Sequence, residues 1–120
     1  MKEKIMIVDD EPSVRKTVNT ILSIKGYKIS EAINADDAWK KIQKDKPDLI
    51  LLDIMMPGMQ PKELIKKIKD NPKLKSIKII YLTAVMGAKE ALKGSKEVFA
   101  TIEKPFTNTQ IRDVIKKALK

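Results

Sequence analysis

Four short, mostly apolar runs are spaced along the chain, at residues 5–8, 49–52, 79–82 and 100–103, and a further strand-like segment covers 27–32. Uninterrupted runs such as 49–52 fit strands that are buried on both faces better than they fit a one-sided sheet. Longer amphipathic segments separate the runs. We therefore predict βαβ units that form a parallel sheet with helices on both faces.

The amphipathic segments have the spacing of helices. They cover about 12–25, 34 or 35 to 44, 61–69 and 108–119. Pro12 suits the first position of a helix, and Gly26 suits a helix end. The last segment has the clearest helical periodicity, carried by Ile111, Val114, Ile115, Ala118 and Leu119.

The segment 84–97 has the weakest pattern, because Gly87 and Gly94 bracket a short and poorly apolar stretch. We predict a helix within it. No repeat or linker divides the chain, so we expect one domain over residues 1–120, long enough for a single buried core.

The composition restricts the chemistry. With no Cys and no His in 120 residues, disulfides, thiolate chemistry and imidazole catalysis are excluded. Metal binding would have to use oxygen ligands. No stretch is long and apolar enough for a membrane span, and the N-terminus does not resemble a secretory signal. We expect a soluble, cytoplasmic chain that does not act at a membrane.

The net charge of +9 comes mostly from Lys, because only Arg15 and Arg112 among the 25 basic residues are Arg. Proteins that read nucleic acids usually favour Arg for bidentate contacts. No recognition motif accompanies the charge, so we favour a solvated, Lys-rich surface over nucleic-acid binding. Attraction to an acidic protein partner remains open.

Polar residues follow the four apolar runs. Asp9 and Asp10 follow the first run, Asp53 the second and Thr83 the third, and Lys104 comes directly after the fourth. If the runs are parallel strands, these ends meet at one edge of the sheet. Three carboxylates, a hydroxyl and an ammonium group are the groups needed to move a phosphoryl group onto an aspartate.

Each of these residues also has an ordinary structural interpretation. The acidic pair could be a solvated turn that favours the next helix N-terminus, and Thr83 could satisfy its own backbone. Asp53, at the end of a buried run, needs a compensating charge. That charge could come from Lys104, whose bond to Pro105 is a candidate cis peptide, or from a cation bridging to Asp10.

The order and spacing of the motifs are more specific than any single residue. The chain contains IVDDEPSVR near its start, DLILLDIMMPGM in the middle, and YLTA and EKPF around the last two runs. With these motifs it resembles a response-regulator receiver domain, the phospho-acceptor module of two-component signalling. The resemblance implies an α/β, flavodoxin-like (βα)5 three-layer sandwich with parallel strand order 2-1-3-4-5 and ligands beyond the carboxyl ends of the strands.

The resemblance also implies a role for each matching position. Asp53 would accept a phosphoryl group from a histidine kinase or phosphotransfer protein and help to hold Mg²⁺. Asp10 would bind Mg²⁺ directly and Asp9 mainly through water, with the backbone carbonyl of Met55 completing the protein ligands. Lys104 would pair with the phosphoryl group, and Thr83 would turn inward to hydrogen-bond it. Such a chain is not an enzyme acting on other substrates, and it signals to a downstream protein that the sequence does not identify.

Some positions depart from the family pattern. Thr101 stands where an aromatic switch residue is usual, and no nearby Tyr or Phe obviously replaces it. Gln60 and Pro61 replace an acidic residue and a Gly in the loop beside Asp53. Met55 and Val85, at positions that control water access, are both apolar, which predicts slow self-dephosphorylation.

Two other function classes remain as alternatives. One is a pseudo-receiver that acts as an interaction scaffold without phosphorylation. The other is an aspartate-nucleophile phosphatase of a related fold, which is disfavoured because Met55 stands where a second catalytic Asp would be needed.

Overall fold

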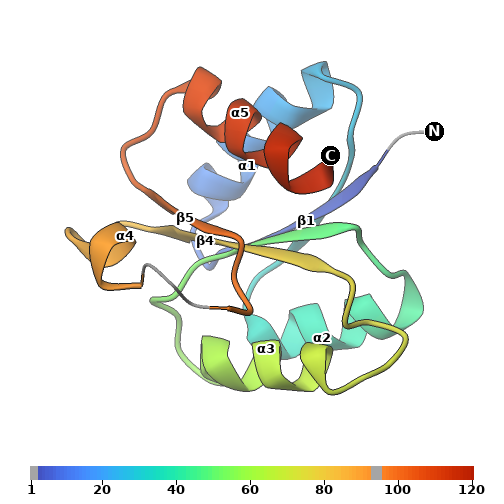
Figure 1. Cartoon of the computed structure of the whole chain (residues 1–120). Coiled ribbons are helices and arrows are strands. Elements are labelled where there is room, and N and C mark those ends of the chain that lie inside the picture. The colour runs from blue at the N-terminus through green and yellow to red at the C-terminus, as the bar shows by residue number, and fades with distance from the viewer. Residues whose placement is uncertain (1–2, 93–95) are drawn as a thin grey trace.

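The computed structural model describes residues 3–92 and 96–120, which form one α/β sandwich (Figure 1). The strands are β1 (Lys4–Val8), β2 (Lys28–Ala32), β3 (Leu49–Leu52), β4 (Lys78–Thr83) and β5 (Ala100–Glu103). The helices are α1 (Pro12–Ile24), α2 (Ala35–Lys44), α3 (Pro61–Lys69), α4 (Ala88–Ala91) and α5 (Asn108–Leu119). All strand pairs are parallel, in the order β2-β1-β3-β4-β5. The predicted doubly wound fold and strand order are confirmed.

The core lies in two layers, one on each face of the sheet. Helices α1 and α5 cover one face, and α2 and α3 cover the other (Figure 1). Strand β3 is buried on both sides, with Ile50 and Leu52 in the layer under α2 and α3, and Leu49 and Leu51 in the opposite layer. This explains the unbroken apolar run, because alternate side chains enter different cores.

The helix ends follow the sequence signals closely. Pro12 begins α1, and Lys25 is its C-cap, followed by Gly26 with a φ of 93°. The side chain of Asn34 accepts a hydrogen bond from the backbone N–H of Asp37 and so caps α2. A capping box between Thr107 and Gln110 starts α5. Because each helix follows a strand of the parallel sheet, the loop that precedes each helix lies at the carboxyl edge of the sheet.

The predicted helix within 84–97 is much shorter than the segment that suggested it. Helix α4 has four residues, Ala88–Ala91, and only Ala88 is buried in it. Gly87 precedes it with a φ of 83°, and Met86 is 94% exposed. With so few apolar positions to bury, the segment supports one helical turn. Residues 93–95 of this prediction lie outside the described part of the chain.

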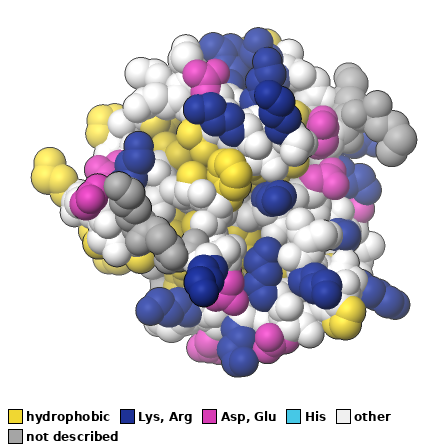
Figure 2. Space-filling view, in the orientation of Figure 1, with side chains coloured by type: hydrophobic (Ala, Val, Ile, Leu, Met, Phe, Trp, Pro, Cys, Tyr) yellow, Lys and Arg dark blue, Asp and Glu magenta, His cyan; other side chains and the backbone are white. Residues whose placement is uncertain are grey.

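On the face that Figure 2 shows, Lys and Arg side chains lie among acidic and uncharged ones. That distribution is the one expected of a solvated Lys-rich surface. Among the described residues, no helix has the length and apolar character that crossing a membrane requires.

Candidate functional site

Carboxylates from two neighbouring strands meet at the carboxyl edge of the sheet. Asp9 and Asp10 follow β1, and Asp53 follows β3, which pairs directly with β1. Each of the three offers an oxygen atom, and these oxygens lie within 4.8 Å of one another. Asp9 and Asp53 are buried, whereas Asp10 is exposed. Clustered carboxylate oxygens with one open side suit a hard divalent cation such as Mg²⁺.

Asp9 is held by hydrogen bonds on all sides. Its Oδ1 accepts from the backbone N–H of Glu11 at 2.9 Å, and its Oδ2 accepts from Lys104 Nζ at 2.9 Å. Its backbone N–H donates to the carbonyl of Ala32 at 3.2 Å, and its carbonyl accepts from Arg15 at 2.7 Å. Asp9 is 0% exposed, so these partners replace the water that its charge would otherwise require.

Lys104 therefore pairs with a different carboxylate from the one suggested for it. Sequence reasoning offered Lys104 as a compensating charge for Asp53, but the ion pair in the structure is with Asp9. Lys104 follows β5, and its bond to Pro105 is cis, as the sequence had suggested. The ammonium still lies close enough to Asp53 to lower its pKa.

Asp53 is buried with less compensation. Its Oδ1 accepts a hydrogen bond from the backbone N–H of Met55 at 3.0 Å. Burial raises the pKa of Asp53 above its ordinary value, and the carboxylates of Asp9 and Asp10 raise it further. The Met55 N–H and the Lys104 ammonium act in the opposite direction. Ionisation of Asp53 therefore costs free energy in the folded protein and lowers its stability.

This cost predicts that Asp53→Asn stabilises the fold at neutral pH. The carboxylate oxygens lie within 4.8 Å of one another, and two unit charges at that separation repel by about 3.5 kcal/mol at an effective dielectric constant of about 20. Because Lys104 offsets part of it, we expect a gain of about 1–2 kcal/mol in unfolding free energy, measured by urea denaturation at pH 7.

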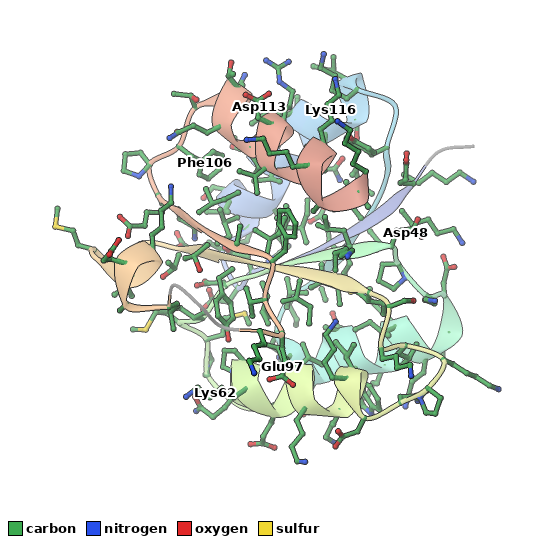
Figure 3. The ribbon with its side chains drawn as sticks, viewed as in Figure 1. Asp48, Lys62, Glu97, Phe106, Asp113 and Lys116 are labelled. Carbon is green, nitrogen blue, oxygen red and sulfur yellow. The ribbon has the colours of Figure 1, made fainter. Side chains whose placement is uncertain are left out.

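The pH dependence of this gain follows from the raised pKa of Asp53. Below its ordinary pKa of 3.8 the carboxyl is protonated in both folded and unfolded chains, so the gain should vanish. It should grow as the pH rises through the higher folded pKa, where wild-type Asp53 loses its proton and the associated stability. The matched control is Asp113→Asn, at an exposed position on α5 (Figure 3). An equal gain in the control would refute the explanation.

Thr83 ends β4 and is fully buried. Its Oγ1 accepts a hydrogen bond from the backbone N–H of Val85 at 3.0 Å, so the hydroxyl satisfies its own loop, as one interpretation of the sequence held. Its carbonyl accepts from the backbone N–H of Lys104 at 2.7 Å, which ties β4 to the start of the EKPF loop. Met55 and Val85 are exposed beside the carboxylates and the hydroxyl, at 65% and 38%.

Tyr81 is a candidate for the aromatic residue that is missing at position 101, and the sequence alone did not indicate it. Thr101 is buried in β5, and the β4–β5 register places Tyr81 directly beside it. Tyr81 is 5% exposed and lies two residues before Thr83, on the same face of β4. Burial raises the pKa of its phenol, and Glu97 raises it further. The signal was the position of YLTA opposite ATIE, which becomes visible only when the strand register is known.

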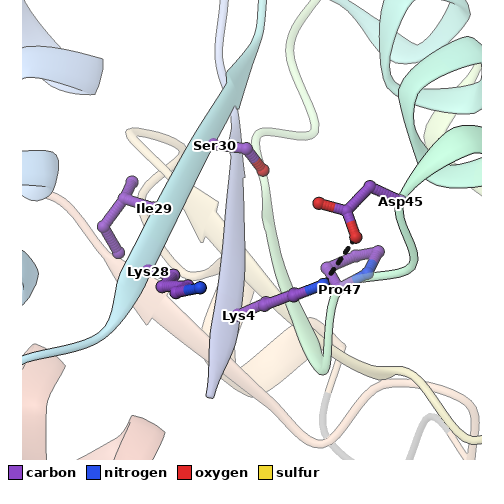
Figure 4. Close-up of a pocket in the computed structure, with 6 residues that line it drawn as sticks. All are labelled: Lys4, Lys28, Ile29, Ser30, Asp45 and Pro47. Carbon is purple, nitrogen blue, oxygen red and sulfur yellow. Dashed lines mark hydrogen bonds and ion pairs between the residues drawn. The ribbon is translucent and has the colours of Figure 1, made fainter. Parts of the chain in front are cut away.

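A separate pocket of about 420 Å³ lies near the amino ends of β1 and β2, away from the carboxyl edge that carries the carboxylates (Figure 4). It is lined by Lys4, Lys28, Ile29, Ser30, Asp45 and Pro47. Its acidic group, Asp45, is paired with Lys4 at 2.6 Å. This pocket contains none of the residues that the sequence motifs single out.

Comparisons with known proteins agree with the geometry. Residues 5–116 match the response regulator receiver domain family. The chain is 38% identical to sporulation initiation phosphotransferase F of Bacillus subtilis, covering 99% of this chain and 95% of that protein. It is 30% identical to the response regulator Rre1 of Synechocystis, covering 96% of this chain but 51% of that protein.

A similar solved structure is that of the response regulator TrrA of Thermotoga maritima, in complex with Mg²⁺ and BeF. The two structures superpose with a TM-score of 0.85 at 36% sequence identity. The match covers 99% of this chain and 100% of the TrrA chain. The sheet order, the edge carboxylates and the family match lead to the same conclusion: this chain belongs to the response-regulator receiver domain family, the receiver module of two-component signalling.

Proposed function

We propose that this chain receives a phosphoryl group on Asp53 from a histidine kinase or phosphotransfer protein, in a Mg²⁺-dependent reaction. The observation that carries the proposal is the meeting of Asp53 with Asp9 and Asp10, with Lys104 beside them, at the carboxyl edge of the sheet. The proposal includes a cytoplasmic location and a downstream protein partner that reads the phosphorylated state. It includes no enzymatic activity on other substrates.

The chemistry needs positioning and charge neutralisation more than covalent assistance. An Asp53 carboxylate oxygen attacks phosphorus, the bond from phosphorus to the donor nitrogen breaks, and the donor imidazole keeps that electron pair. The product is an acyl phosphate. Mg²⁺, held by Asp10, Asp9, Asp53 and the carbonyl of Met55, would supply charge neutralisation for the phosphoryl oxygens.

Lys104 and Thr83 would act on the phosphorylated state. The Lys104 ammonium now bonds to Asp9 at 2.9 Å, and it would turn towards a phosphoryl oxygen on Asp53, whose pKa it already lowers. Thr83 would exchange its hydrogen bond with Val85 for one to the phosphoryl group. This exchange would release the loop before α4, favouring a conformation that a partner can recognise.

The second candidate function is a scaffold that works without phosphorylation. The unusual surroundings of Thr101 motivate it, because the usual aromatic is absent at that position. The retained carboxylates and Lys104 favour the phosphorylated receiver over the scaffold.

A beryllium fluoride titration separates the two candidates. In the presence of Mg²⁺, ¹⁵N chemical shifts of wild-type residues around Asp53, Thr83 and Lys104 should change, and those of Asp53→Ala should not. Shifts that stay unchanged in the wild type would favour the scaffold.

Phosphorylated protein should lose its phosphoryl group slowly. The apolar side chains of Met55 and Val85 stand beside the site, and neither can orient an attacking water molecule. We expect Met55→Asn to speed the loss, because an amide side chain can hydrogen-bond and orient the attacking water molecule. The decay of intact mass after removal of the phosphodonor measures both rates. A wild-type half-life of a few seconds would contradict this expectation.

A further inference from the structure

Arg15 connects the turn that carries Asp9 and Asp10 to strand β2. It lies in α1, with its side chain 14% exposed. One guanidinium nitrogen, Nη1, donates to the carbonyl oxygen of Asp9 at 2.7 Å. The Nε donates to Glu31 at 3.0 Å, at the end of β2. A planar guanidinium can hold both acceptors at fixed relative positions, which a flexible ammonium cannot do.

Glu31 is itself held in place. Its Oε2 accepts from Asn19 Nδ2 at 2.8 Å, and its backbone carbonyl accepts from Lys41 Nζ at 2.7 Å. The next residue, Ala32, accepts the backbone N–H of Asp9. Both sides of the Asp9 backbone are therefore anchored to β2, directly through Ala32 and indirectly through Arg15 and Glu31.

This anchoring opposes a force that the site itself creates. Carboxylate oxygens of Asp9, Asp10 and Asp53 lie within 4.8 Å of one another, so the three ionised groups repel. The turn that carries Asp9 and Asp10 would relax away from Asp53 unless its backbone were held. We propose that Arg15 is a positioning residue that keeps this turn in the geometry needed to bind a divalent cation.

A purely electrostatic role for Arg15 predicts the opposite result. Removing a positive charge near the site reduces repulsion of Mg²⁺ and should tighten its binding. Loss of positioning should weaken binding, since losing a group that orients a metal ligand typically costs 10- to 100-fold in affinity. The direction of the change therefore distinguishes the two roles.

The test compares Arg15→Gln with Lys16→Gln. Both remove one positive charge from adjacent positions of α1. Lys16 is exposed, and its side chain has no hydrogen bond to any described residue. Calorimetric titration with MgCl₂ alone should show roughly 10-fold weaker binding for Arg15→Gln and no weakening for Lys16→Gln. Arg15→Lys keeps the charge without the planar group, and it should also bind Mg²⁺ more weakly than wild type.

A second measurement needs no metal. The Mg²⁺ titration rests on the proposed function, whereas this measurement tests the role of Arg15 separately. In metal-free protein the backbone amide of Glu11, which bonds to Asp9, should exchange with solvent roughly 10-fold faster in Arg15→Gln. The amide of Leu51, in the core, should be unaffected. If Arg15→Gln proves too unstable, Arg15→Lys provides the same comparison.

Mg²⁺ binding in Arg15→Gln as tight as in Lys16→Gln would overturn the positioning role, as would unchanged exchange at Glu11. If the wild type neither binds Mg²⁺ nor accepts a phosphoryl group, the proposed function fails. The exchange of Glu11 would still decide whether Arg15 positions the turn.

Discussion

Replacement of Lys104 by Met is expected to slow phosphoryl transfer from acetyl phosphate to Asp53 by roughly 100-fold. Met has a similar length but no charge, so it offers no donor to the phosphoryl oxygens where negative charge develops. In enzymes, losing one such donor costs about 10²–10³ in rate. The rate of mass gain under excess acetyl phosphate and Mg²⁺ measures the effect.

The same substitution should also destabilise the fold. The ammonium of Lys104 bonds to the carboxylate of Asp9, which is 0% exposed. Leaving a buried charge without its partner costs about 3–5 kcal/mol. Urea denaturation should detect this loss, and the rate must be measured under conditions in which the variant is folded. Lys116→Met, at an exposed site on α5 (Figure 3), is the control and should change neither quantity. A normal transfer rate in folded Lys104→Met would contradict the assigned role.

Asp10→Asn is expected to weaken Mg²⁺ binding more than Asp9→Asn does. Asp10 is exposed, and among the described residues its carboxylate has no hydrogen bond or ion pair, so its oxygens are available to an ion. Both carboxylate oxygens of Asp9 already accept hydrogen bonds, from Glu11 and Lys104. We expect losses of roughly 100-fold for Asp10→Asn and roughly 10-fold for Asp9→Asn.

Calorimetric titration with MgCl₂ measures both affinities. Asp113→Asn removes the same charge from the outside of α5 and should leave the affinity nearly unchanged. Equal losses for the two site variants would show that Asp9 and Asp10 share the ion equally. A larger loss for Asp9→Asn would reverse their assigned roles.

The edge of the sheet that carries the site was predictable from sequence because few physical rules determine it. Unbroken apolar runs indicate buried parallel strands, and parallel strands end at the same edge. Asp9 and Asp53 each follow such a run directly, so their proximity depends only on β1 and β3 being neighbours, as they are. The bounds of α2 and α5 were also predicted closely, because the apolar spacing of an amphipathic helix can be read from the local sequence.

Side-chain partners were less predictable, because they depend on packing between distant segments. Lys104 pairs with Asp9, across a separation of 95 residues, rather than with Asp53. The proximity of Tyr81 to Thr101 depends on the register between β4 and β5. The contact of Arg15 with the Asp9 carbonyl depends on how α1 packs against β2. A motif indicates which residues gather at a site, but not which of them bond to one another.

The most direct test is to identify the residue to which a phosphoryl group becomes attached. Purified wild-type protein incubated with acetyl phosphate and Mg²⁺ should gain the mass of one phosphoryl group, and Asp53→Ala should gain none. Borohydride reduction of the acyl phosphate, followed by peptide mass spectrometry, should place the modification at Asp53. No mass gain in the wild type, or an equal gain in Asp53→Ala, would contradict the assignment of Asp53 as the phospho-acceptor.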